Sequence, residues 1–195
     1  MVFHITQGFA NRFNLTMADA LPAEEKVSAM HLLKIKKWDP LVAWGIKGFD
    51  FGKYKCFQML NFATKFSLFV FNVEDGSVEN LGDIIWEYMN VIYAGDEEML
   101  AALEKYFTVN RYSVFTPLLD KPSLASLVRN EQMFTNLEKL GKYVDGGVLQ
   151  TKKLNTEYNK GYLVARIFRG KTEFIVPADR FRQLVIERFG GDSNE

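Results

Sequence analysis

Short hydrophobic runs set the pattern of the chain between residues 41 and 73. Three of them, LVAWGIKGF, YKCFQMLN and FSLFVFNV, are rich in residues that favour strands, and short connections separate them. Connections of this length join neighbouring antiparallel strands. The third run is apolar on both of its alternating faces, which is typical of a central strand covered by helices. We therefore expect an antiparallel meander over residues 41–73.

After residue 79 the hydrophobic positions change to helical spacing. Four segments show this period, near residues 80–93, 96–107, 123–139 and 178–189. Asp96 is a suitable N-cap for the second helix, and Pro177 stands at the start of the fourth. In the third helix the apolar positions at helical spacing are Leu124, Leu127, Val128, Phe134 and Leu137.

The remaining segments predict further strands around the same core. GYLVARIF and TEFIV, separated by a turn, predict a hairpin over residues 161–176. Residues 1–5 and the run RYSVFTPLL each predict a short strand, and residues 15–30 predict a loop with a short helix. Runs of strands followed by helices indicate an α+β fold. We expect an antiparallel sheet packed by several helices, in a single domain over residues 1–195, with a short flexible tail from about residue 190.

Composition allows a folded core of ordinary size. The chain has 195 residues, of which 48% are hydrophobic and 17 are Phe. The single Cys56 cannot form an internal disulfide, and the N-terminus lacks the basic and apolar regions of a signal peptide. No apolar run approaches the roughly 20 residues of a membrane helix. These features predict a soluble, cytoplasmic protein with no membrane contact.

Charge is balanced overall but separated along the chain. Residues 34–65 carry seven Lys against two Asp, residues 66–104 carry nine acids and no Lys or Arg, and residues 105–195 carry fifteen basic against ten acidic residues. Such blocks can steer a charged partner, although the solvated faces of two helices would produce the same acidic block.

Catalytic and metal-binding motifs are absent from the sequence. The two histidines, His4 and His31, fit no metal-binding spacing, and Cys56 has no second cysteine. There is no nucleophile elbow and no phosphate-binding loop. We expect no metal and no cofactor. The sequence therefore favours a protein that is not an enzyme. An active site formed by acidic residues that are distant in sequence is a remaining alternative.

The segment KGFDFGKY partly matches the RNA-recognition strand. Its basic, glycine and aromatic positions fit, but Asp50 and Gly52 replace a small and an aliphatic residue. Because Asp and Gly favour turns, the segment is better explained as a strand connection that presents Lys47, Lys53 and Lys55.

The leading hypothesis is a non-enzymatic binding or regulatory module. It would recognise a protein partner through a charged surface, with Trp86 and Glu87 on the acidic helix as candidate contacts. The oligomeric state is not predicted.

Two alternatives belong to other classes. One is a small hydrolase or transferase for a nucleotide-like substrate, with Lys53, Lys55 and Asn61 near the pocket. The other is a single-strand nucleic-acid binder, in which Trp38, Trp44 and the nearby lysines form a stacking platform.

About half of the chain resembles a family of small bacterial proteins of uncharacterised function. The matching stretches are Trp44 leading into KYKCFQMLNFATKFSLFVFNV, and SVFTPLLDKPSLASLVRNEQMFTNL. The positions that carry the resemblance are Trp44, Asn61, Thr64, Ser67, Ser126 and Asn130. Gly45 and Gly48 depart from the family pattern. The resemblance implies a domain of bacterial origin and adds Thr64 and Asn130 to the candidate binding residues, but it implies no activity.

Overall fold

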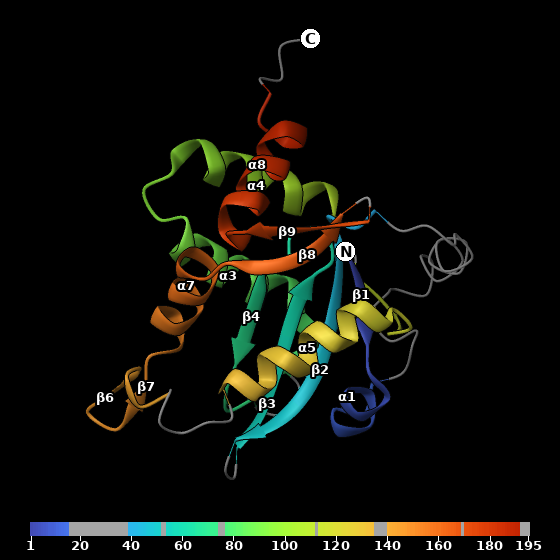
Figure 1. Ribbon diagram of the computed structural model, residues 1–195, viewed down its shortest axis with the longest axis vertical. Coiled ribbons are helices and arrows are strands. Elements are labelled where there is room, and N and C mark those ends of the chain that lie inside the picture. The colour runs from blue at the N-terminus through green and yellow to red at the C-terminus, as the bar shows by residue number, and fades with distance from the viewer. Residues whose placement is uncertain are drawn as a thin grey trace.

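A mixed five-stranded sheet forms the centre of the molecule (Figure 1). The computed structural model describes residues 1–15, 39–51, 54–73, 77–111, 113–134, 140–168 and 170–191. The strand order is β4-β3-β2-β1-β5. The strands are β1 (Val2–Ile5), β2 (Ala43–Phe51), β3 (Tyr54–Asn61), β4 (Ser67–Val70) and β5 (Val114–Pro117).

The predicted meander is confirmed, whereas the prediction of a wholly antiparallel sheet needs correction. β2, β3 and β4 pair antiparallel, as their short connections require. β1 lies between β2 and β5 and runs parallel to both. Long stretches of chain separate these strands in sequence, and such connections allow parallel pairing.

Helices cover both faces of the sheet. On one face lie α1 (Gln7–Arg12), α3 (Leu81–Ile92), α4 (Glu97–Val109) and α8 (Pro177–Phe189), which share the main hydrophobic core. On the other face lies α5 (Lys121–Phe134), in front of the sheet in Figure 1, whereas α7 (Thr151–Gly161) lies beside the edge strand β4. The short η1 (Ser77–Asn80), β6 (Val144–Asp145) and β7 (Val148–Leu149) complete the elements outside the C-terminal hairpin. The α+β class and the four predicted helices are confirmed.

The predicted C-terminal hairpin forms, but as a separate sheet. β8 (Val164–Phe168) and β9 (Lys171–Ile175) pair only with each other among the described strands, and they cross the upper end of the central sheet in Figure 1. The predicted loop and helix over residues 15–30 fall outside the described residues from residue 16 onward, and the predicted tail does so from residue 192.

β4 is an edge strand, although its two apolar faces had predicted a central one. Side-chain amides of α7 occupy the place of a further strand. Asn155 accepts from the Phe69 amide at 2.8 Å and donates to the Phe69 carbonyl at 2.9 Å. Asn159 does the same with Ser67, at 2.9 and 2.7 Å. An unpaired edge is therefore satisfied without a strand, since each amide group mimics one backbone unit.

A glycine in β2 leaves room for the ring of Phe62. A Cβ atom at Gly45 would lie 2.9 Å from Cε1 of Phe62 and 3.4 Å from Cδ1 of Leu127 on α5. The first distance is shorter than a normal contact, so a larger residue at position 45 would displace the Phe62 ring.

Candidate functional site

Trp44, a candidate for ligand stacking, lies in the core. Its indole Nε1 donates to the Tyr106 hydroxyl at 3.3 Å, and that hydroxyl donates to the Leu41 carbonyl at 3.0 Å. The ring also packs against Phe66 and Phe181. Because Trp44 is fully buried and its polar atom is satisfied, it presents no stacking surface to a nucleic acid.

Asn61 and Thr64 are brought together, but they organise a turn. The Asn61 side-chain oxygen accepts from the Ala63 and Thr64 amides, each at 3.2 Å, and from the Thr64 hydroxyl at 3.0 Å. The Asn61 amide nitrogen donates to the Leu41 carbonyl at 2.8 Å. Both side chains are fully buried, so they hold the β3–β4 connection in place.

Asn130 lies near this turn and is also buried. Its side-chain nitrogen donates to the Ser67 hydroxyl at 3.3 Å, which ties α5 to β4. Ser126, the remaining position of the family resemblance, donates to the Pro122 carbonyl within α5 at 3.0 Å. Asn61, Thr64, Ser67 and Asn130 therefore lie around the β3–β4 connection, whereas Trp44 belongs to the main core.

The lysine platform is not assembled in the described residues. Lys55 is exposed on β3, opposite Asp50 of β2. Asp50 in turn pairs with Arg12 of α1 at 2.8 Å. Lys53 and Trp38, which the sequence placed beside Lys55 and Trp44, lie outside the described residues.

Trp86 and Glu87 lie on α3, but internal contacts engage both. Trp86 is partly buried, with its ring edge-on to Phe107 at 5.2 Å between centroids. Glu87 pairs with Lys152 of α7 at 2.9 Å. Basic residues in the C-terminal part of the chain thus form ion pairs with some of the acidic residues of α3 and α4. Arg182 of α8 adds a further pair, to the Asp96 carboxylate at 2.6 Å.

The apolar positions of α5 divide between two sides of the helix. Leu124 and Val128 are 36% and 37% exposed, whereas Ser123, Leu127 and Asn130 are buried. The side chains of the other two predicted positions, Phe134 and Leu137, lie outside the described part of the chain.

The sheet beneath α5 carries polar groups among apolar ones. Lys47 of β2 pairs with Glu131 of α5. Gln58 of β3 lies opposite Lys47 on the same face and is buried, and its side-chain atoms have no hydrogen-bond partner in the described part of the chain. Phe49 and Leu60 share this face and are buried as well. The pair between Lys47 and Glu131 is therefore one contact that turns a charged side of α5 toward the sheet.

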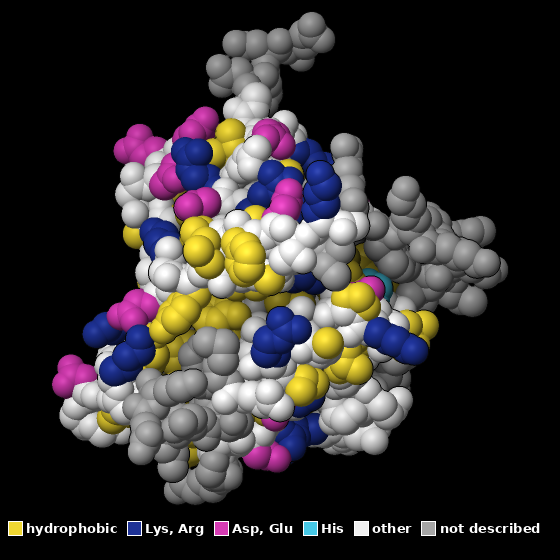
Figure 2. Space-filling view, viewed as in Figure 1, with side chains coloured by type: hydrophobic (Ala, Val, Ile, Leu, Met, Phe, Trp, Pro, Cys, Tyr) yellow, Lys and Arg dark blue, Asp and Glu magenta, His cyan; other side chains and the backbone are white. Residues whose placement is uncertain are grey.

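The outer side of α5 is hollowed. A depression of about 450 Å³ is lined by Lys121, Leu124, Ala125, Val128, Arg129 and Gln132. Figure 2 shows this side of the molecule, where hydrophobic side chains lie among basic ones over α5. Among the described lining residues the charged ones are both basic. This surface, which we call the α5 face, combines an apolar strip with positive charge.

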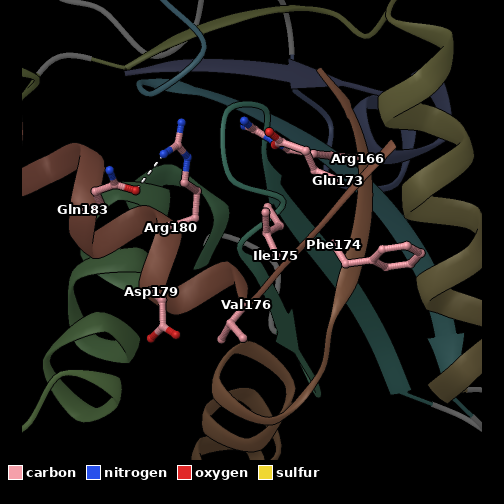
Figure 3. A pocket seen from close by; sticks show the side chains of 8 residues that line it. All are labelled: Arg166, Glu173, Phe174, Ile175, Val176, Asp179, Arg180 and Gln183. Atoms are coloured by element: carbon pink, nitrogen blue, oxygen red, sulfur yellow. Dashed lines mark hydrogen bonds and ion pairs between the residues drawn. The ribbon is translucent and has the colours of Figure 1, made fainter. Parts of the chain in front are cut away.

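A second hollow lies between the β8–β9 hairpin and α8 (Figure 3). It has a volume of about 670 Å³ and is lined by Arg166, Glu173, Phe174, Ile175, Val176, Asp179, Arg180 and Gln183. The residues from α8 recur at positions three and four apart, so they share one side of that helix. We call this hollow the hairpin pocket.

Two arginines in the hairpin pocket differ in how they are held. Arg166, 10% exposed, donates from Nε to Glu173 at 2.8 Å and from Nη1 to the Ala63 carbonyl at 2.8 Å. Arg180 donates from Nη1 to Oε1 of Gln183 at 2.7 Å. In the described part of the chain, Nε of Arg180 is buried without a hydrogen-bond acceptor.

Ionisable groups elsewhere give no sign of catalysis or metal binding. Burial lowers the pKa of His4, against opposing effects of the Pro117 carbonyl and Asp120. Burial raises the pKa of the Cys56 thiol, which therefore stays protonated and unreactive. Within the described ranges, His, Cys, Asp and Glu side chains nowhere gather in a set that could hold a metal ion. Nor do these ranges contain a helix long and apolar enough to cross a membrane.

Sequence reasoning missed both hollows. It also missed helix α7, the hydrogen bonds between its asparagine amides and β4, and the orientation of α5. Each of these is determined by contacts between residues that are far apart in the sequence.

The fold and these surfaces define a single α+β domain with a mixed sheet, covered by helices on both faces, and two surface hollows. Comparisons of this chain with protein-family models, curated proteins and solved structures gave no match. The family resemblance in the sequence therefore stays a prediction.

Proposed function

We propose that this protein is a non-enzymatic binding module that recognises a protein partner through the α5 face. The observation that carries the proposal is the orientation of α5, which leaves Leu124 and Val128 at the surface. They are four residues apart and so adjacent on one side of the helix. Apolar side chains gathered in a hollow, rather than scattered singly, are typical of interaction surfaces.

The charge of the α5 face indicates the chemistry of the partner. Lys121 and Arg129 lie at its two ends, eight residues apart along the helix, which is about 12 Å at the rise of an α-helix. A partner segment with apolar side chains between two carboxylates at that separation would complement both features. In an α-helical segment those carboxylates would stand about eight residues apart. We infer that the partner presents an acidic amphipathic helix.

The acidic helices are a weaker candidate for the docking surface. Trp86 is partly covered, and Glu87 is paired with Lys152, so a partner would have to displace contacts that exist already. On the α5 face, by contrast, Leu124 and Val128 are exposed in the isolated chain. The proposal also places the protein in the bacterial cytoplasm, as its single cysteine and the family resemblance suggest.

Selection from a phage-displayed library of random peptides tests the proposal. We expect the enriched peptides to combine apolar residues with Asp or Glu at helical spacing. The variant L124S/V128S should weaken their binding by about tenfold or more, because it removes the apolar area that the peptide buries. The matched control is V91S/V109S, which changes exposed valines of α3 and α4 and should bind as the wild type does.

Two results would contradict the proposal. One is enrichment of basic peptides, which would point to the acidic helices. The other is an equal loss of binding in L124S/V128S and V91S/V109S, because such a loss would not depend on the α5 face.

A further inference from the structure

We propose that the hairpin pocket binds an oxyanion, the carboxylate or phosphate group of a small molecule, through the guanidinium of Arg180. This site is separate from the α5 face: it lies between the β8–β9 hairpin and α8, and none of the residues that line one hollow lines the other.

The state of Arg180 is the first observation that points to a ligand. A guanidinium carries five N–H donors and is always charged. In the described part of the chain, the Arg180 side chain has one hydrogen bond, to the neutral amide of Gln183, while its Nε is buried with no acceptor. Burying a charged donor without an acceptor is costly. Once the Arg180 side chain turns to expose Nε, an oxyanion that accepts from Nε and a terminal nitrogen would remove this cost through a bidentate contact.

The nearby acids do not fill this role. Glu173 accepts from Arg166, the other arginine of the pocket. Asp179 precedes Arg180 directly on α8, and neighbouring residues of a helix do not face each other. Figure 3 shows Asp179 pointing to the end of the pocket opposite the Arg180 guanidinium. Gln183 is a neutral acceptor that an incoming oxyanion could replace or share.

Arg166 lies at the same end of the pocket as the Arg180 guanidinium, together with the Glu173 carboxylate that pairs with it (Figure 3). Hydrogen bonds to Glu173 and the Ala63 carbonyl hold the Arg166 guanidinium in place. Because Glu173 balances the charge of Arg166, the guanidinium of Arg180 is the positive group that the oxyanion would meet.

The rest of the pocket indicates what accompanies the oxyanion. Its volume of about 670 Å³ falls within the range of small-molecule sites and is far larger than a phosphate group needs. Ile175 and Val176 supply apolar contacts beside α8, whereas the Phe174 ring points away from the Arg180 guanidinium at the rim (Figure 3). The ligand class is therefore a small molecule with an oxyanion at one end and an apolar or aromatic body.

Nuclear magnetic resonance on the full chain tests the site directly, because the Nε–H group of Arg180 gives its own signal. Inorganic phosphate and benzoate are titrated separately, with sodium chloride at matched ionic strength as the reference. We expect a saturable shift of the Arg180 Nε–H signal with at least one probe and none with chloride. Tighter binding of phosphate would identify a phosphate ligand, and tighter binding of benzoate a carboxylate with an apolar body.

Variants on α8 complete the test. R180Q should weaken binding of the responding probe by roughly tenfold or more, since a charge-assisted hydrogen bond is lost. R180K keeps the charge but not the planar fork and should show a smaller loss. R188Q changes an arginine of the same helix that pairs with Asp39, outside the pocket, and should bind as the wild type does.

Three outcomes would overturn the proposal: no saturable shift with either probe, undiminished affinity in R180Q, or an equal loss in R188Q. The wild-type titration is informative even if R180Q fails to fold. L124S/V128S should retain the phosphate or benzoate response, so failure of the oxyanion site and failure of the α5 face can be told apart.

Discussion

At the scale of single residues, asparagine side chains replace a strand. The amides of Asn155 and Asn159 satisfy the backbone groups of Phe69 and Ser67 at the edge of β4. Their spacing of four residues puts both on the same side of α7, so one helix covers two backbone units of the strand. The edge of β4 is therefore protected from pairing with another chain, and the backbone N–H and C=O groups of Ser67 and Phe69 keep their hydrogen bonds.

Replacing Asn159 with leucine tests this role. N159L keeps the approximate volume but leaves the buried N–H and C=O of Ser67 without partners. We expect a loss of about 2–4 kcal/mol in the free energy of unfolding, measured by denaturant titration. The control T156A, on the same helix, removes a half-exposed hydroxyl and should change stability by less than about 0.5 kcal/mol. Similar losses in both variants would contradict the account.

Residue chemistry alone did not separate core from surface. The sequence identified Trp44, Asn61, Thr64 and Asn130 as unusual, and all are buried in the structure. Each has its polar atoms satisfied by groups that are distant in sequence or belong to a turn, as the bond between Trp44 and Tyr106 shows. A binding role and a packing role use the same residue types, so burial has to decide between them.

At the scale of elements, α5 shows how far a hydrophobic pattern can be used. The pattern predicted the helix correctly, because apolar residues spaced three and four positions apart indicate helical geometry. It could not predict which side faces the sheet, because that depends on contacts with other elements, such as the pair between Lys47 of β2 and Glu131. The place of β4 at the edge escaped prediction for the same reason: its missing neighbour is a pair of side chains on α7.

The start of α4 was predicted from sequence and offers a test at this scale. Asp96 caps α4 by accepting from the Met99 amide at 3.1 Å and also pairs with Arg182. Glu98 pairs with the same arginine at 2.7 Å but caps nothing. We expect D96A to lower the thermal midpoint, by the equivalent of about 1–2 kcal/mol.

E98A should cost less than about 0.5 kcal/mol, because its ion pair is largely exposed. Calorimetric melting curves of D96A and E98A would check this difference. If both variants lost the same stability, the ion pairs rather than the cap would be the dominant contribution.

At the scale of the whole molecule, charge and apolar surface are divided between different sides. The acidic helices α3 and α4 contact basic residues of α7 and α8, so part of the charge separation seen in the sequence is satisfied within the fold. α5 lies on the other face of the sheet, where it presents apolar side chains between Lys121 and Arg129. This division supports a partner that approaches α5 rather than the acidic helices.

Site-specific photo-crosslinking in cells that express the protein naturally tests this central claim most directly. A photoreactive amino acid is placed at Val128 on the α5 face or at Val91 on α3, which are equally exposed at 37%. The account predicts a crosslinked protein from position 128, attached through an acidic amphipathic segment, and none from position 91. Crosslinks from position 91 alone, or equally from both positions, would contradict it.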